Sequence, residues 1–405
     1  MPLTPTLCVL PALTAAEGEG GSFILTRKFL DGVLEYASRW PGRVVVGIDR
    51  AADDAGNLDH VAVDPHEVPF DLRWMCPADR DRTVHELVSR STVVLATLVD
   101  KHVDLALRCR LLGVPLVYVT EYSEQTRRQI IRAETSNPML RWRRERWTMR
   151  LERRYVNAIK TAAGVQCNGT PTFRTYRVHN PRPLLYFDTR VRARQLADRD
   201  TIERRIIDML SGGALRLAFS GRLIRMKGAD HLPRVAAELR ATGVPFTLDI
   251  CGAGEIEPQL KRELQRQQLS DCVRMRGVLN FATELLPMIA QSVDLFVCCH
   301  RQGDPSCTYL ETLACGTPIV SYDNEAFQGI ATMASIGWMA RMNEPALLAR
   351  RIGWLHQHRQ ALARSARNAL RFASEHTLES TMQARIDHLL ACADDPQQTL
   401  KGAAA

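Results

Sequence analysis

Long hydrophobic runs are missing from this chain of 405 residues. No stretch reaches the roughly 18 consecutive apolar residues that a membrane-spanning helix needs. The first residues, MPLTPTLCVLPALTAAEGEG, also lack the basic flank of a secretory signal. We therefore expect a cytoplasmic protein, and we leave open a peripheral attachment to the inner face of the cytoplasmic membrane.

Cysteine pairs with the spacing of a metal site are also absent. The eleven cysteines are scattered and odd in number, which favours reduced thiols over a disulfide framework. Cys298 and Cys299 are adjacent and precede His300, but no second pair follows downstream as a zinc site requires. We expect buried apolar thiols there and no metal.

The composition is that of an ordinary globular protein and carries an excess of positive charge. Hydrophobic residues make up 45% and charged residues 24%, which excludes a disordered or fibrous chain. The net charge of +8 favours anionic partners such as phosphates, nucleic acid or an acidic membrane, without choosing among them.

Short apolar runs rich in branched residues recur between helical stretches. They lie at 7–13, 43–49, 91–98, 114–120 and 164–168, and again at 215–221, 245–252, 272–277, 293–299 and 317–322. This alternation predicts parallel strands crossed over by helices, so each half of the chain reads as a doubly wound α/β domain. Ligands of such sheets bind outside the carboxyl ends of the strands, which places the chemistry between the two domains.

The predicted domains follow from the change in pattern along the chain. We expect an amino-terminal Rossmann-like domain, a linker, a carboxyl-terminal Rossmann-like domain, and a final helix before a frayed end. The corresponding ranges are 1–185, 186–212, 213–375 and 376–405.

The segment AFSGRLIRMKGADHLPRVAAEL (218–239) reads as a strand, a glycine, two cations, a second glycine and an amphipathic helix. Gly221 lets the backbone approach a ligand closely, and Arg222 and Lys227 place positive charge near a helix start that favours a phosphate. The segment predicts a cradle for a diphosphate. The alternative is a surface turn with ordinary basic residues.

A second polar segment follows the strand at 293–299. Asp304 and Pro305 form a good helix start, and Glu311 lies one to two turns further on. Free amides for a second anion come from Ser306, Cys307 and Thr308. Glu311 is placed to accept hydrogen bonds from a ribose. The alternative is that Asp304 is only a cap and Glu311 only a solvated residue.

Four segments of the second half occur together in one order and spacing: GRLIRMKG, DICGAGE (249–255), RMRGVLN (274–280) and DPSCTYLETLACGTPIV (304–320). In the order and spacing of these segments the chain resembles the retaining glycosyltransferases of family 4, the glycosyl transferases group 1. The segment DPSCTYLE resembles that of a subgroup of bacterial polysaccharide transferases. The resemblance implies the GT-B fold, an α/β architecture of two Rossmann-like domains facing across a cleft, with a helical carboxyl-terminal tail. It also implies that the first domain lies on the acceptor side, that the second domain binds the nucleotide-sugar donor, and that the last helix returns toward the first domain.

The resemblance also implies roles for individual residues. Arg222 and Lys227 hold the donor diphosphate, and Glu311 holds the donor ribose. The nucleoside is bordered by Gly252, Gly254 and the backbone around Val278. The family's first glutamate stands eight positions before the second, and that position here is Gly303. Asp304, one step later, is the candidate for the same work near the donor sugar.

The first half offers weaker candidates. Family members carry a glycine loop near GEGGS (18–22), where Gly20 and Gly21 would face the donor phosphates, and the alternative is a plain strand-to-helix turn. Candidates for acceptor or phosphate contact follow the strand at 114–120, against an alternative of surface solvation; they are Glu121, Arg127 and Arg128. His102 and His179 stay open as candidates, although isolated histidines are usually structural.

The run RWRRERWTMRLERR (141–154) holds seven arginines, two glutamates and two tryptophans. As a helix it would lie on an anionic membrane with Trp142 and Trp147 at the interface. The alternative is a surface helix whose tryptophans pack on the domain. Nucleic acid is not expected as a partner, because no recognised binding motif accompanies the charge.

The leading hypothesis is a hexosyltransferase-type enzyme that moves a sugar, with retention, from a nucleotide diphosphate sugar to a saccharide or polyprenyl-linked acceptor in bacterial surface polysaccharide biosynthesis. We expect no metal and no other cofactor, because the cations of the cradle neutralise the leaving group. The alternatives are a sugar-nucleotide epimerase or a phosphorylase on the same fold, and a non-catalytic module that binds nucleotide sugar, suggested by Gly303.

Overall fold

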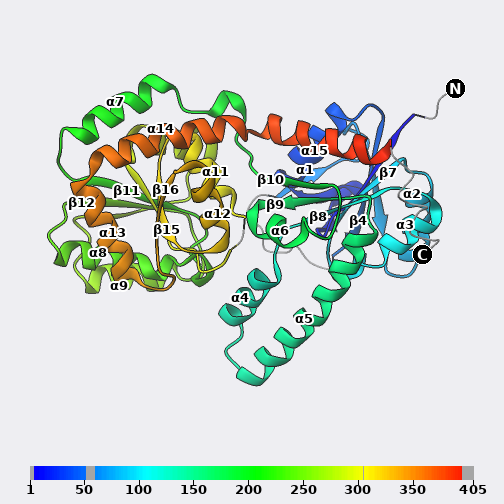
Figure 1. The fold of residues 1–405 in the computed structure, drawn as a ribbon, viewed down its shortest axis with the longest axis horizontal. Helices are drawn as coiled ribbons and strands as arrows, with labels where there is room; N and C mark the ends of the chain where they lie inside the picture. The colour runs from blue at the N-terminus through cyan, green and yellow to red at the C-terminus, as the bar shows by residue number, and fades with distance from the viewer. Residues whose placement is uncertain (1–3, 52–59, 304, 395–405) are drawn as a thin grey trace.

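The computed structural model describes residues 4–51, 60–303 and 305–394. These residues form two α/β domains that lie side by side along the long axis of the molecule (Figure 1). Each domain contains a parallel sheet flanked by helices, as βαβ connections require. The predicted pair of Rossmann-like domains with a helical carboxyl-terminal tail is confirmed.

The amino-terminal sheet contains parallel strands in the order β6-β4-β1-β7-β8-β9-β10. These are β1 (Thr6–Leu10), β4 (Arg43–Arg50), β6 (Asp71–Met75), β7 (Val93–Thr97), β8 (Leu116–Thr120), β9 (Gly164–Asn168) and β10 (Pro183–Tyr186). Strands β2 (Thr14–Glu17), β3 (Phe23–Thr26) and β5 (His60–Val63) continue the sheet from the last residues of β4. Helices packed on this domain are α1 (Arg27–Arg39), α2 (Arg80–Ser89), α3 (Leu105–Leu112) and α6 (Gly169–Tyr176).

A helical hairpin, residues 124–161, projects from the amino-terminal domain (Figure 1). It consists of α4 (Glu124–Glu134) and α5 (Pro138–Thr161). Asn137 begins α5 by accepting hydrogen bonds from the first amides of the helix, and Pro138 occupies the first turn. Glu145 of α5 accepts from Arg128 of α4 at 3.1 Å, so an ion pair joins the two helices along their length.

The carboxyl-terminal sheet is parallel throughout, with the order β13-β12-β11-β14-β15-β16. Its strands are β11 (Leu215–Ser220), β12 (Phe246–Cys251), β13 (Val273–Gly277), β14 (Leu295–Cys298), β15 (Ile319–Tyr322) and β16 (Gly337–Ala340). Its helices are α7 (Arg199–Leu210), α8 (Leu232–Ala241), α9 (Glu257–Arg266), α10 (Leu286–Ser292), α11 (Cys307–Ala314), α12 (Glu325–Ala334) and α13 (Pro345–Gln357). The strand order reverses between β11 and β14: β11 to β13 follow one another across the sheet in one direction, and β14 to β16 in the opposite direction. Doubly wound sheets bind ligands at such a point.

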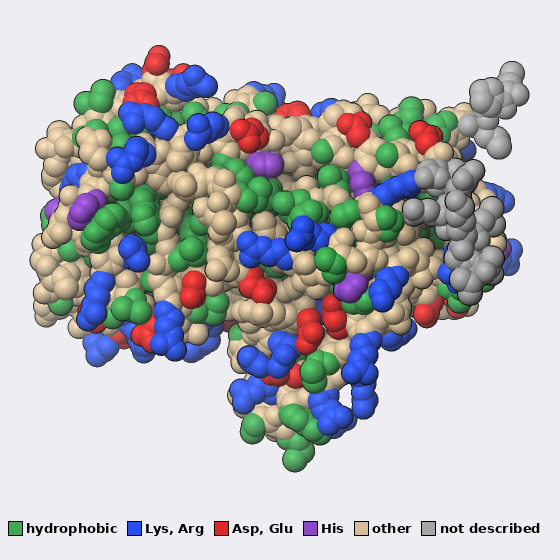
Figure 2. All heavy atoms as spheres, viewed as in Figure 1, with side chains coloured by type: hydrophobic (Ala, Val, Ile, Leu, Met, Phe, Trp, Pro, Cys, Tyr) green, Lys and Arg blue, Asp and Glu red, His purple; other side chains and the backbone are tan. Residues whose placement is uncertain are grey.

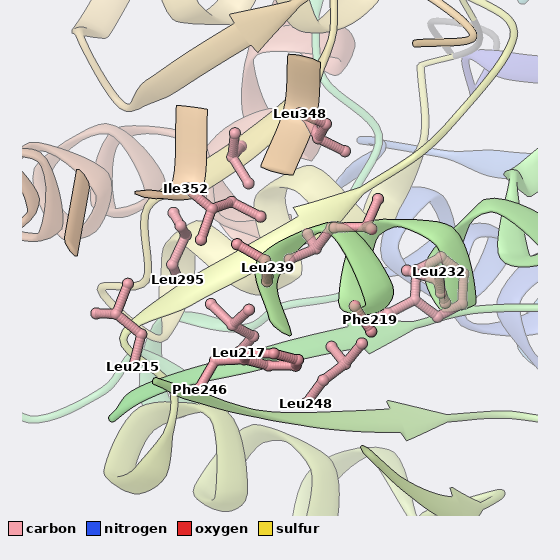
Figure 3. Close-up of a cluster of buried hydrophobic side chains, with 14 of the residues drawn as sticks. Leu215, Leu217, Phe219, Leu232, Leu239, Phe246, Leu248, Leu295, Leu348 and Ile352 are labelled. Atoms are coloured by element: carbon pink, nitrogen blue, oxygen red, sulfur yellow. The ribbon is translucent and has the colours of Figure 1, made fainter. Parts of the chain in front are cut away.

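The core of this domain explains why its strands read as apolar runs. Leu217 and Phe219 of β11 lie under Leu239 of α8 and Ile352 of α13, and all of these side chains are almost fully buried (Figure 3). Residues of the same strands that point to the other face, such as Ala218, belong to a second buried cluster. Both faces of the sheet are therefore covered, as expected for a parallel sheet.

The chain returns to the first domain at its end. Helix α14 (Arg359–Glu375) packs on the carboxyl-terminal domain and α15 (Leu378–Ala393) crosses to the amino-terminal domain (Figure 1). Leu378, Met382 and Ile386 are buried in the amino-terminal core. The predicted linker contains α7, whose buried residues belong to the carboxyl-terminal core, so the irregular connection is the shorter stretch 187–198.

Candidate active site

The loop after β11 is shaped by Gly221 and Gly228, which adopt backbone conformations unfavourable to other residues. Gly228 has a φ of +69°, and a Cβ there would lie 2.0 Å from the carbonyl oxygen of Cys299. The loop is therefore pressed against the end of β14. Lys227 is 9% exposed and its Nζ lies 3.4 Å from Oγ of Ser306, whereas Arg222 is exposed. The predicted diphosphate cradle and the predicted second anion site at the start of α11 thus meet.

Ser306 precedes α11 in an extended conformation, and its side chain does not cap the helix. The first amides of α11, including those of Cys307 and Thr308, have no carbonyl of the same helix to bind. Together with the helix dipole they favour an anion at this point. Asp304 lies outside the described residues, so its predicted role is a statement about the sequence alone.

Glu311 is not a solvated helix residue, because only 8% of it is exposed. Its Oε1 accepts a hydrogen bond of 2.8 Å from Nε of Arg190. The guanidinium of Arg190 in turn lies over the ring of Phe281, 3.7 Å from the ring centre. A ribose at Glu311 would therefore share this carboxylate with Arg190, a residue that no sequence motif marked.

The glycine-rich turn after β12 packs directly on the loop after β11. A Cβ on Gly252 would lie 2.0 Å from the carbonyl oxygen of Gly221, and one on Gly254 would lie 2.4 Å from that of Leu223. Val278 is 70% exposed and lines a cavity of about 660 Å³ between the domains. The structure brings these three predicted nucleoside neighbours to the same edge of the sheet as the cradle.

An ionic cluster that the sequence did not reveal joins the domains beside α11. Nζ of Lys28, in the first turn of α1, lies 2.5 Å from Oδ2 of Asp188 and 3.0 Å from Sγ of Cys307. Burial raises the pKa of the Cys307 thiol to about 12, so the thiol is neutral. The amino-terminal domain therefore places a cation against the start of α11.

Glu121 follows β8 and lines a second cavity, of about 320 Å³, at the carboxyl ends of the strands. Its Oε2 accepts a hydrogen bond of 3.0 Å from Nδ2 of Asn168. Burial, and then the nearby negative charge of Asp188, raise the pKa of Glu121. Lys28, Asp188 and Arg385 line both cavities, so the cavity at Glu121 adjoins the one between the domains.

Other candidates of the first half lie elsewhere. Gly20 and Gly21 form the exposed turn between the antiparallel strands β2 and β3 rather than a direct strand-to-helix turn. Arg127 pairs with Glu152 inside the helical hairpin, as Arg128 does with Glu145. Nδ1 of His102 donates a hydrogen bond of 2.9 Å to the carbonyl of Thr97, and the residue is 1% exposed. His179 is half-buried in the turn after α6.

The tryptophans of the basic run do not pack on the domain. Trp142 is 58% exposed and Trp147 is 55% exposed, and Met139, Leu140 and Met149 of the same helix are exposed as well. Figure 2 shows hydrophobic and basic side chains gathered over the projecting hairpin. The interpretation of a helix whose tryptophans pack on the domain is therefore wrong.

Two general properties of the described residues complete the picture. All eleven cysteines are described and are free thiols, and Cys298 and Cys299 are fully buried as predicted. Within the described ranges, no group of three or more His, Cys, Asp and Glu side chains is arranged to hold a metal ion. No helix in the described part of the chain is long and apolar enough to cross a membrane.

Residues 207–372 match the family model described as glycosyl transferases group 1. The carboxyl-terminal domain belongs to this family. The group 1 glycosyltransferase domain so defined contains the cradle, the glycine-rich turn and α11. A protein of Salmonella typhimurium named as a colanic acid biosynthesis glycosyltransferase, WcaL, is 26% identical over 147 residues, which are 35% of this chain and 36% of that protein. The match thus spans little more than a third of the relative.

Solved structures resemble the whole chain and not only the group 1 glycosyltransferase domain. Anabaena Alr3699/HepE in complex with UDP has a TM-score of 0.67 and 16% identity, covering 96% of this chain and 99% of its own. WaaG, a glycosyltransferase involved in lipopolysaccharide biosynthesis, has a TM-score of 0.57 and 14% identity, covering 95% and 99%. At such identities the likeness concerns the fold, and the predicted GT-B fold is confirmed.

Proposed function

We propose that the protein is a retaining glycosyltransferase that moves a hexosyl group from a nucleotide diphosphate sugar to a hydroxyl of a saccharide or lipid-linked saccharide, in the biosynthesis of a surface polysaccharide. The observation that carries the proposal is the nearly buried Lys227 beside Ser306 at the free amino end of α11. A colanic acid biosynthesis relative and a UDP complex of the same fold support it.

The proposed chemistry uses the cations and amides already described. The bond between the anomeric carbon and the diphosphate oxygen breaks, and negative charge grows on the diphosphate. Preorganised donors stabilise such charge, and we assign this role to Lys227, Arg222 and the first amides of α11. The acceptor hydroxyl attacks from the face that the diphosphate leaves, and a phosphate oxygen takes its proton. The positive side chains supply the neutralisation that a metal ion supplies elsewhere.

The test replaces the two cations separately and measures transfer of sugar. One preorganised charge-stabilising donor is worth about 10²- to 10³-fold in turnover, so Lys227→Ala and Arg222→Ala should each reduce transfer by that factor. Arg225→Ala is the matched control: this arginine lies in the same loop but its guanidinium bonds Gln259 of α9, so transfer should stay close to that of the unchanged protein. Unchanged turnover in both cradle variants would remove the diphosphate assignment.

Incubation of the unchanged protein with its donor separates the proposed transferase from an epimerase and from a non-catalytic module. The donor is first identified by thermal shift with uridine and guanosine diphosphate sugars, since a bound ligand raises the stability of the folded protein. A changed epimer formed from the nucleotide sugar alone would indicate an epimerase. Binding without transfer to any saccharide and without slow hydrolysis of the donor would indicate a non-catalytic module.

We also infer that the helical hairpin binds an anionic membrane surface, which places the protein at the inner face of the cytoplasmic membrane. The exposed Trp142 and Trp147 suit the interface, and the surrounding arginines suit the headgroups. Each basic residue near such a surface is worth about 1 kcal/mol at low salt.

The membrane test is sedimentation with vesicles. Binding should require anionic lipid and should weaken as salt is raised. The double variant Trp142→Ala, Trp147→Ala should bind less with an unchanged melting temperature, because both rings are exposed. Trp354→Ala is the control, since this tryptophan is 40% exposed on the other domain. Equal binding to vesicles without anionic lipid would contradict the inference.

A further inference from the structure

The backbone at Gly303, where the resemblance expects the first glutamate, is held by the other domain. The amide of Gly303 donates a hydrogen bond of 2.9 Å to Oε1 of Gln129. The carbonyl of Gly303 accepts one of 3.1 Å from Oγ1 of Thr126. Both side chains belong to α4, so this helix fixes the loop that leads into Ser306.

A side chain at position 303 would be crowded by its neighbours. A Cβ built on Gly303 lies 3.1 Å from Cβ of Glu325, 3.3 Å from Oε2 of Glu325 and 3.3 Å from Oγ1 of Thr126. Such distances are shorter than ordinary contacts between a Cβ and its neighbours. The carboxylate of Glu325 therefore lies beside the space that a side chain at 303 would enter.

The fold brings Glu325 to the same edge of the sheet as the cradle. Glu325 is the first residue of α12, directly after β15, and β15 pairs with β14, which leads to Gly303. Asn324 caps the helix by accepting from the amide of Phe327 at 2.9 Å. This cap fixes where the helix begins, and so fixes the direction in which Glu325 leaves the backbone.

The carboxylate of Glu325 is half-buried and held by one contact from the other domain. Its Oε2 accepts a hydrogen bond of 3.1 Å from Oγ of Ser123. Burial raises its pKa, against the opposing influence of that hydrogen bond and of Arg174. A carboxylate can accept several hydrogen bonds, so Glu325 retains acceptor capacity for hydroxyl groups of a ligand.

We propose that Glu325 supplies the carboxylate that contacts the hydroxyls of the donor sugar, in the place that Gly303 leaves open. This assignment rests on the proposed function. Two neighbouring hydroxyls of a hexosyl group present donors that a carboxylate accepts in charge-assisted hydrogen bonds. Glycine at 303 is then the complement of glutamate at 325, because one position provides the space and the other the acceptor.

The experiment compares the affinity for a nucleoside diphosphate with that for the matching nucleotide sugar. Glu325→Gln keeps the size of the side chain and removes the charge, and Glu325→Ala removes the carboxylate. We expect both variants to bind the nucleoside diphosphate as the unchanged protein does and to bind the nucleotide sugar about ten- to hundredfold more weakly. Glu263→Gln, in an exposed ion pair of α9, is the control and should change neither affinity.

Each other result counts against the assignment. Equal losses for the two ligands in Glu325→Gln would show a structural role, and unchanged affinity for the nucleotide sugar would show no contact. Asp304→Asn is measured in parallel, and a selective loss in that variant alone would give the role to Asp304. If the unchanged protein binds no nucleotide sugar, the proposed function itself falls, and this result differs from a failure confined to Glu325.

Discussion

Arg205 of α7 is a buried cation whose removal should make the carboxyl-terminal domain easier to unfold. Its guanidinium donates to the carbonyls that end α10 and α11 and to one hydroxyl: Ile289 (3.1 Å), Ala290 (2.8 Å), Cys315 (3.1 Å), Gly316 (2.5 Å) and Oγ1 of Thr317 (3.0 Å). Burial lowers the pKa of Arg205 to about 10, so it stays charged at neutral pH. One side chain thus donates to carbonyl groups at the ends of two helices.

The size of the effect follows from those contacts. Arg205→Met keeps much of the volume but leaves buried carbonyls without donors, and each such group costs about 1 to 3 kcal/mol. Relaxation of the surrounding structure reduces the summed cost of these carbonyls. We therefore expect the free energy of unfolding to fall by about 3 to 5 kcal/mol, the range for breaking a buried charged pair. For a domain of this size that corresponds to a fall of about 6 to 20 °C in melting temperature.

The assay is thermal unfolding followed by circular dichroism, with Arg204→Met as the matched control. Arg204 precedes Arg205 on the same helix, is exposed and bonds only the hydroxyl of Thr201 among the described residues. Its replacement should change stability by less than about 0.5 kcal/mol. Equal melting temperatures for the two variants would refute the reasoning, because exposure and burial would then have the same consequence.

Two further predictions concern the same domain. Gly228→Ala should displace Lys227 and reduce transfer as strongly as Lys227→Ala, because the new Cβ would meet the carbonyl of Cys299 at 2.0 Å; a fully active variant would contradict the steric argument. Burial lowers the pKa of His231, which lies 2.7 Å from the hydroxyl of Tyr322, to about 4. The unfolded chain therefore binds this proton first, so the contribution of His231 is present above pH 6.5 and lost toward pH 4. At pH 5 the loss is about 2 kcal/mol, and urea unfolding of His231→Gln at pH 7 and 5 should show a smaller change than the unchanged protein.

The central strands of both sheets could be predicted from the sequence, and some edge elements could not. Buried parallel strands such as β8 and β11 are continuous apolar runs. Strand β6 (DLRWM) alternates apolar and charged residues, and β16 (GWMA) has only four residues. The turn at Gly20 was expected to lead straight into a helix, but β3 intervenes. Short or mixed segments become strands through pairing with distant partners, which a local pattern does not reveal.

Some residues of the candidate site could likewise be predicted from the sequence, and others could not. Lys227 and Ser306 could be found because each belongs to a recognisable turn and helix start, although 79 positions separate them. Lys28 and Asp188, 160 positions apart, belong to no motif, and only the packing of two domains brings them together. Arg190 and Glu325 were missed for the same reason. Exposure of Trp142 also depends on where the helical hairpin leaves the domain, which composition does not determine.

The crossing of α15 gives the amino-terminal domain a core that is discontinuous in the chain. Strand β10 ends at Tyr186 and α15 begins at Leu378. During synthesis almost two hundred residues are therefore added before the helix that completes the core of the first domain. At about 5 to 20 residues per second this takes about 10 to 40 s. A fragment cut after β10 would leave the apolar surface under Met382 and Ile386 uncovered. A chimera that exchanges amino-terminal domains must therefore carry α15 with its own first domain.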